Sequence, residues 1–134
     1  MIKTYQGSCH CGAIRYEADI DLSKGTLKCN CSICTKARNW IAMAKPEAFR
    51  LLAGEEDLTD YQFGRKRIHH LFCKHCGIHA FGWADSPDLG GKTYAVNVMC
   101  LDNVEPGVLA KAPVTYFDGR HDNWQSPPAE TSYL

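Results

Sequence analysis

Three cysteines lie within six positions near residue 30, and their spacing is typical of a metal-binding loop. Cys29, Cys31 and Cys34 form a Cys-x-Cys-x-x-Cys pattern, in which a short loop can direct three sulfurs toward one ion. Zinc in proteins is tetrahedral and binds thiolates well, so three protein ligands would leave its fourth position for water or a substrate. The sequence therefore predicts an open zinc site at which a substrate could be activated.

Three other interpretations of this cysteine triplet stay open. Cys31 and Cys34 also form a Cys-x-x-Cys pair, which is a redox motif in some proteins. The thiols could instead be unreactive cysteines of an ordinary loop, or a remote ligand could close the tetrahedron and leave no free position. Cys100 is the candidate for such a ligand, although its simplest interpretation is a small buried core residue.

Four further cysteines form two closely spaced pairs that together would complete a structural metal site. Cys9 and Cys11 lie in a glycine-rich turn, and a glycine directly follows the Cys-x-x-Cys pair of Cys73 and Cys76. Such turns adopt the backbone angles that a metal knuckle needs, and four thiolates fill a zinc tetrahedron. Because the pairs are far apart in the sequence, a shared ion would clip two distant segments together and stabilise a small β-rich chain.

The segments that must position these cysteines show mainly the period-two alternation of β-strands. Strands are expected at residues 2–6, 13–18, 26–28, 40–44, 58–63, 67–72 and 93–98, and a short strand with a turn is expected within residues 114–120. A hairpin bend is predicted at residues 64–66, a helical turn at 32–38 and a loop at 85–91. Strands thus outnumber helices, and the predicted fold class is mainly β.

Length and composition are those of a soluble globular protein. The 134 residues are 45% hydrophobic and 22% charged, which predicts a single domain spanning residues 1–134. The 15 basic and 15 acidic residues cancel, so no overall field favours nucleic acid or an anionic membrane as a partner. No apolar run resembles a signal peptide or a membrane span. We therefore expect a cytoplasmic protein, whose reduced cysteines would serve as metal ligands rather than form disulfides.

An open zinc site suggests chemistry on a thiol. A thiol that entered the free position would lose its proton near neutral pH, and the resulting nucleophile could attack an aldehyde carbon. The alkoxide formed in that attack would need a proton, and histidine can supply one at neutral pH. The candidate histidines are His69, His70, His75, His79 and His121. Spacing alone does not choose among them, although alternation in a strand would direct His69 and His70 to opposite faces.

Basic residues could receive the carboxylates of an anionic thiol, since arginine can pair with a carboxylate through two hydrogen bonds. The candidates are Lys36, Arg38, Arg65, Lys66 and Arg67. Such residues more often only solvate loops, so their role stays open.

Five short blocks follow one another along nearly the whole chain. They are Gly7–Gly12, the triplet Cys29–Cys34, Phe72–Gly77, Val96–Asp102 and Phe117–Arg120. Together they resemble the glutathione-dependent formaldehyde-activating enzyme family, also called the centromere protein V-type domain. The resemblance implies an Mss4-like fold of packed antiparallel sheets with zinc knuckles and little helix. It also implies two zinc ions per chain: a structural ion at Cys9, Cys11, Cys73 and Cys76, and a catalytic ion at Cys29, Cys31 and Cys34.

The resemblance also implies an activity and its partners. The family's named reaction joins formaldehyde and glutathione as S-(hydroxymethyl)glutathione, and this reversible formation of a carbon–sulfur bond is classed with the lyases. A small thiol such as glutathione and a small aldehyde would then be the partners. Two other functions stay open, because a fold does not determine activity: a non-catalytic interaction domain stabilised by zinc, and a thiol redox protein that uses Cys31 and Cys34.

Overall fold

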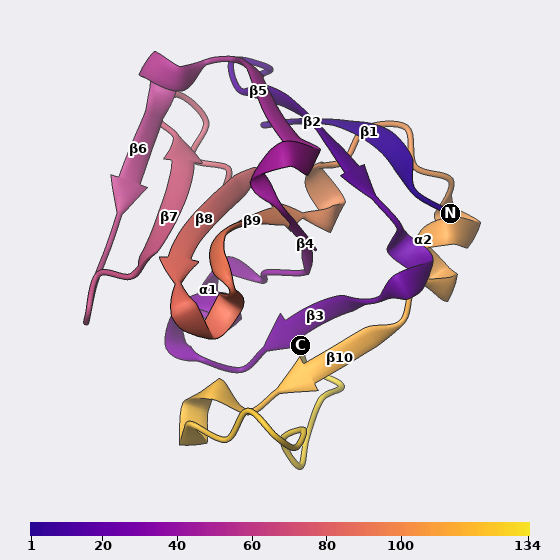
Figure 1. The fold of residues 1–134 in the computed structure, drawn as a ribbon, viewed down its shortest axis with the longest axis vertical. Helices are drawn as coiled ribbons and strands as arrows, with labels where there is room; N and C mark the ends of the chain where they lie inside the picture. Colours follow the sequence, from indigo (N-terminus) through magenta and orange to yellow (C-terminus); the bar gives the residue numbers. More distant parts are fainter.

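The computed structural model describes residues 1–134, and two β-sheets account for most of the regular structure (Figure 1). The smaller sheet is antiparallel, in the order β1 (Lys3–Ser8), β2 (Arg15–Ile20), β5 (Phe49–Ala53). The larger sheet has seven strands in the order β10 (Val114–Phe117), β3 (Thr26–Cys29), β4 (Ile41–Ala44), β9 (Gly91–Asn97), β8 (Phe81–Ser86), β7 (Ile68–Cys73), β6 (Leu58–Tyr61). The predicted mainly β class with antiparallel sheets is confirmed.

One pair of strands departs from the antiparallel pattern. β10 runs parallel to β3, with Val114 beside Thr26 and Phe117 beside Cys29. Parallel neighbours need a long crossover, and here most of the chain lies between the two strands. This pairing carries the segment after β10 to the cysteine triplet, which begins where β3 ends.

Little of the chain is helical. The α-helices are α1 (Ser32–Ala37) and α2 (Pro106–Lys111). Single 3₁₀ turns connect several strands: η1 (Leu22–Lys24), η2 (Pro46–Ala48), η3 (Glu55–Asp57), η4 (Pro87–Leu89), η5 (Val98–Cys100) and η6 (Gly119–His121). None of the helices has the length and apolar character required to cross a bilayer.

Most local predictions hold. β1 and β2 form the first hairpin, with Lys3 opposite Ile20, and β6 and β7 form the second, with Tyr61 opposite His70. The helical turn predicted at residues 32–38 is α1, which ends where Arg38 adopts a left-handed backbone with φ 55°.

Several local features differ from the predictions, and two of them are whole strands, β5 and β8, at residues where no strand was expected. The loop predicted at residues 85–91 is too long, because Asp85 and Ser86 pair with Lys92 and Gly91 and so extend β8 and β9. These four paired residues lie at the end of the sheet and are not hydrophobic. The alternation that predicts a strand is therefore absent at these positions. The helix α2 was not predicted; it begins at Pro106, whose fixed φ suits the first helical position.

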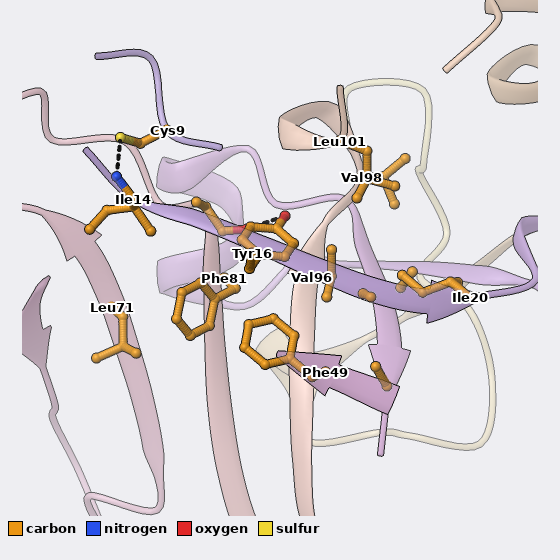
Figure 2. Close-up of a cluster of buried hydrophobic side chains, with 14 of the residues drawn as sticks. Cys9, Ile14, Tyr16, Ile20, Phe49, Leu71, Phe81, Val96, Val98 and Leu101 are labelled. Carbon is orange, nitrogen blue, oxygen red and sulfur yellow. Dashed lines mark hydrogen bonds between the residues drawn. The ribbon is translucent and has the colours of Figure 1, made fainter. Parts of the chain in front are cut away.

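The hydrophobic core is centred on Tyr16, whose side chain is fully buried. Its ring lies 5.2 Å from that of Phe49 and 5.4 Å from that of Phe81 (Figure 2). The hydroxyl donates a hydrogen bond of 3.1 Å to the carbonyl of Ala80, and burial raises the pKa of the phenol. Tyr16 therefore packs residues of both sheets around one ring while its polar atom stays satisfied.

Gly7 of β1 lies directly against this ring. A Cβ atom at Gly7 would come within 2.2 Å of Cζ of Tyr16, much closer than nonbonded carbon atoms approach. Only glycine lets the main chain of β1 pass so near Tyr16 without displacing the ring.

We predict that Gly7→Ala lowers the free energy of unfolding by about 1–3 kcal/mol, because the added methyl group forces the buried Tyr16 ring to move. Gly107→Ala is the matched control, since Gly107 lies in α2 and no atom lies within 4 Å of a Cβ placed there. It should be neutral or stabilise by up to about 1 kcal/mol. Urea unfolding at equal metal content measures both changes, and equal stability of Gly7→Ala and the wild type would contradict the steric argument.

Candidate functional site

The structure brings together the four cysteines predicted to form a structural site. Their sulfurs lie within 4.8 Å of one another, and they belong to Cys9, Cys11, Cys73 and Cys76. The separation is 3.6 Å between the sulfurs of Cys9 and Cys11 and 3.6 Å between those of Cys11 and Cys73. A tetrahedral ion with metal–sulfur bonds of about 2.3 Å requires sulfur separations of about 3.8 Å. The donor set therefore fits a zinc-sized thiophilic cation.

The two halves of this cluster are held by their own turns and by the core. The amide of Ile14 donates to the sulfur of Cys9 at 3.3 Å (Figure 2), and the amide of Gly77 donates to the carbonyl of Cys73 at 2.8 Å. Cys9 and Cys73 are themselves buried core residues. An ion bound here would join the first hairpin to the end of β7.

The structure also brings together the sulfurs of the triplet, Cys29, Cys31 and Cys34, within 4.8 Å of one another. Cys29 ends β3, Cys31 directly precedes α1, and Cys34 lies within that helix. The amide of Cys31 donates to the sulfur of Cys29 at 3.4 Å, and Nδ2 of Asn39 lies 3.6 Å from the sulfur of Cys34. These donors favour thiolates and orient the sulfurs.

The thiols of the triplet influence one another's ionisation. Hydrogen bonds from Cys29 and Cys34 lower the pKa of the Cys31 thiol, because donors directed at a thiolate stabilise it. Hydrogen bonds to Cys29 and Cys31 raise the pKa of Cys34, and burial adds to the increase. Without a metal, the cluster thus favours the thiolate form of Cys31 alone. A bound divalent cation would favour the thiolate form of all three cysteines.

Cys100 does not complete the triplet. Its sulfur lies 3.9 Å from the carbonyl oxygen of His79, and it belongs to neither thiol cluster. Burial raises its pKa to about 11, and nearby negative charges at Asp102, Cys9 and Cys76 contribute. Cys100 was expected to be a small buried core residue, and the structure shows it half-buried and packed against the core. No fourth cysteine, histidine or carboxylate lies within 4.8 Å of all three sulfurs of the triplet.

Asn30, between the first two cysteines of the triplet, anchors the loop to the segment after β10. Its side-chain amide donates to Asp118 at 2.8 Å, and its Oδ1 accepts from the amide of Arg120 at 2.9 Å. Asn30 is only 2% exposed, and its hydrogen bond is the main cause of the lowered pKa of Asp118. No role was predicted for Asn30, and its position between two candidate ligands was the only signal in the sequence.

Gly119, at the start of η6, lies against the sulfur of Cys29 and the Cβ atom of Cys31. A Cβ atom there would lie 2.6 Å from Sγ of Cys29, 2.9 Å from the Trp124 ring and 3.1 Å from Cβ of Cys31. The segment after β10 thus forms one wall of the triplet, and only glycine leaves room for the sulfurs. Gly119 belongs to a sequence block noted above, but only the structure shows this contact.

Three of the candidate histidines are engaged with acidic side chains. His69 pairs with Asp60 at 2.5 Å, His75 with Asp57 at 2.9 Å and His121 with Asp118 at 2.9 Å. The ring of His69 also stacks on Trp83, with centroids 3.8 Å apart.

His70 and His79 differ from these three, because neither forms an ion pair with a carboxylate. Burial lowers the pKa of each. For His70, the positive charge of His79 adds to this lowering of the pKa, and the negative charge of Cys31 opposes it. Its ring stacks on Phe63, with centroids 5.4 Å apart.

The candidate basic residues fall into two groups. Arg65, Lys66 and Arg67 lie exposed in the connection between β6 and β7, whereas Lys36 and Arg38 belong to α1 and its cap. Arg38 and Lys28 line a cavity of 30 Å³ beside the triplet, which also touches Cys29 and Cys34. A larger hollow of 460 Å³ lies over Leu27 and Phe117, and none of the eight cysteines lines it.

We predict that Gly119→Ala weakens divalent metal binding at the triplet by about tenfold or more, because the added methyl group overlaps Cys29 and misdirects a ligand. Titration with cobalt(II) measures this, since thiolate-to-cobalt absorption reports each cluster. The four-cysteine cluster should retain its affinity, and Gly107→Ala should match the wild type. Two cobalt ions bound with wild-type affinities by Gly119→Ala would contradict the proposed wall.

Known proteins similar to this chain identify its family. A family model described as glutathione-dependent formaldehyde-activating enzyme matches residues 4–117, a range that includes all eight cysteines. The chain is also similar to a Rhodobacter sphaeroides protein of known crystal structure. The two are 34% identical, the match covers 82% of this chain and 99% of the other, and the TM-score is 0.69. The chain therefore belongs to the glutathione-dependent formaldehyde-activating enzyme family.

Proposed function

We propose that the protein is a zinc-dependent carbon–sulfur lyase that adds a small thiol to a small aldehyde, as in the synthesis of S-(hydroxymethyl)glutathione. The observation that carries this proposal is the triplet: three sulfurs within 4.8 Å of one another and no fourth side-chain ligand within reach of all three. Such a donor set suits an ion with one position free for substrate. Membership in the family supports glutathione and formaldehyde as the reactants.

Two zinc ions per chain are part of this proposal. We assign a structural ion to Cys9, Cys11, Cys73 and Cys76, and a catalytic ion to Cys29, Cys31 and Cys34. The sulfur separations of 3.6 Å in the first cluster support the assignment. All eight cysteines are free thiols, which is compatible with a reducing compartment, and we propose a cytoplasmic location on this basis.

At the triplet, zinc would supply stabilisation of the substrate's thiolate near neutral pH. Three protein thiolates already donate charge there, so the site's contribution is mainly to bind and orient the thiol. The substrate sulfur then attacks the aldehyde carbon, the new carbon–sulfur bond forms, and the carbonyl electron pair becomes an alkoxide that takes one proton. The reverse sequence cleaves the adduct.

Among the histidines, His70 is our candidate for moving that proton. Burial lowers its pKa, so the imidazole is neutral at pH 7 and can accept the proton that the thiol releases before returning it to the alkoxide. His70 also has no carboxylate partner among the ion pairs of the protein. His69, His75 and His121 are paired with carboxylates.

The two clusters should respond differently to loss of a ligand. Cys73→Ser should reduce the free energy of unfolding by about 4 kcal/mol or more, because metal binding at the four-cysteine cluster joins two distant segments and its binding energy contributes to folding. Cys31→Ser should leave the fold intact and lower the zinc content from about two ions per chain toward one. Chemical unfolding and metal analysis of the purified variants provide the two measurements. Equal loss of stability in both variants would show that the clusters do not have separate roles.

The proposed activity predicts that zinc-loaded protein accelerates exchange between formaldehyde plus glutathione and the hydroxymethyl adduct. Exchange NMR follows both directions and does not depend on which one operates in the cell. Because the uncatalysed addition is already fast, Cys34→Ser at the same protein concentration is the control, since it removes a ligand of the triplet and spares the four-cysteine cluster.

Exchange should be about tenfold or more faster with the wild type than with this control, because changes at or around a metal site typically reduce activity by at least that factor. Equal rates for wild type, variant and buffer would refute the assigned reaction. If glutathione then also failed to reach the metal, a non-catalytic zinc-stabilised domain would be the better description.

A further inference from the structure

A hollow of the size that small molecules occupy lies over β3, β4 and β10. Its volume is 460 Å³, and its lining includes the apolar side chains of Leu27, Ile41, Met43 and Phe117. Binding sites for small molecules are typically of this size and mainly apolar. Met43 is 40% exposed, so apolar surface in the hollow is accessible to a ligand.

Strand register connects this hollow to the triplet. Leu27 and Cys29 are two residues apart in β3, so their side chains lie on the same face of the sheet. β10 runs beside β3 (Figure 1), with Thr115 next to Leu27 and Phe117 next to Cys29. Phe117 therefore lines the hollow and is also a direct neighbour of a candidate metal ligand.

Trp124 continues the apolar surface from Phe117 toward the triplet, because the centroids of the two rings lie 6.1 Å apart. A carbon atom at the Cβ position of Gly119 would be 2.9 Å from Cη2 of Trp124 and 2.6 Å from Sγ of Cys29, so the indole edge lies close to that sulfur. Nε1 of the indole donates a hydrogen bond of 2.7 Å to Oδ1 of Asp122. Trp124 is nevertheless 54% exposed, which leaves an oriented aromatic surface beside the candidate metal site.

The two reactants of the proposed reaction differ in what would hold them. The thiol binds the metal through its sulfur, whereas the aldehyde must be held by the surrounding protein. Formaldehyde has only hydrogens on its carbonyl carbon and so offers nothing that an indole or an apolar hollow could bind. An aldehyde with an apolar substituent could use both surfaces, and burial of that substituent would keep the carbonyl carbon near the sulfur.

We infer that Trp124, Phe117 and the hollow form a subsite for the substituent of the aldehyde, and that the substrate class is an aldehyde with an apolar group such as an aromatic ring. This inference rests on the proposed function, because it takes the triplet as the place where the thiol is activated. It goes beyond the family's named reaction, since formaldehyde would leave the subsite unfilled.

Binding of two unreactive thioethers to the zinc-loaded protein tests the subsite. S-Methylglutathione and S-benzylglutathione both carry a carbon on sulfur at the place of the aldehyde carbon, and only the second adds an aromatic ring. Calorimetry should give a Kd about tenfold or more lower for the benzyl compound, because burial of a ring against aromatic side chains contributes at least this factor. Equal Kd values for the two compounds, or no binding of either, would refute the subsite.

Three variants, compared at equal zinc content, locate the preference for the benzyl compound. Trp124→Ala removes the indole, and Thr115→Phe fills the hollow from an exposed position of β10. Both should bring the two Kd values within about twofold of each other. Leu52→Ala is the control and should keep the wild-type preference, because Leu52 is also 54% exposed but lies in β5, a strand of the smaller sheet without a cysteine. A tenfold preference that persisted in both Trp124→Ala and Thr115→Phe would refute the subsite.

NMR of the indole groups provides a second, local measurement. The Nε1 proton signal of Trp124 is identified by its loss in Trp124→Ala. It should shift on saturation with S-benzylglutathione, whereas the corresponding signal of Trp83 in β8 should not move. A Trp124 signal that stayed in place at saturation would contradict a ring bound beside the indole.

The outcomes separate this inference from the proposed function, because neither thioether reacts. If the two thioethers bind equally and exchange of formaldehyde with glutathione is still accelerated, the subsite is refuted and the proposed function stands. If the benzyl preference is lost in Trp124→Ala and Thr115→Phe but exchange is accelerated with neither formaldehyde nor benzaldehyde, the subsite stands and the proposed function is refuted. If these two variants instead weaken binding of glutathione itself to the cobalt(II) protein by about tenfold, the apolar surface serves the thiol, and its assignment to the aldehyde is refuted.

Discussion

The parallel pairing of β10 with β3 is the constraint on which the candidate site depends. It sets Phe117 beside Cys29, so the residues that follow β10 reach the loop that follows β3. Asn30 then donates a hydrogen bond to Asp118 and accepts one from the amide of Arg120, and Gly119 lies against the sulfur of Cys29. Parallel neighbours require a long crossover. The residues that line the triplet at 29–34 therefore come from a segment far along the chain, at residues 117–121.

The two thiol clusters differ in their surroundings, and this difference matches the roles that we propose. The four-cysteine cluster includes core residues Cys9 and Cys73 and connects segments that are distant in sequence. The triplet comes from one short loop at the end of a strand, next to a cavity and two cations. A cluster that joins distant segments contributes to folding, whereas a local cluster at an edge can keep a position accessible to substrate.

Much of the fold and of the candidate site could be predicted from sequence because its signals are local. Thiol spacing depends on a few adjacent residues, so Cys-x-Cys and Cys-x-x-Cys identified both groups that the structure brings together. Period-two alternation identified the hairpins of β1 with β2 and of β6 with β7. The same signal fails where strands end in polar residues, and for that reason the pairing of Asp85 and Ser86 with Lys92 and Gly91 was missed.

By itself, the sequence determined which residues could be ligands and that strands would position them, because side-chain chemistry and alternation are properties of short segments. Only the tertiary structure decided that Cys100 stays outside the triplet and that Asn30, Gly119 and Lys28 belong to its surroundings. The contacts of Lys28, Asn30 and Gly119 join residues 28–31 to residues 118–134, and no local pattern specifies which distant segments meet. That choice depends on strand pairing and on how the whole chain buries its core.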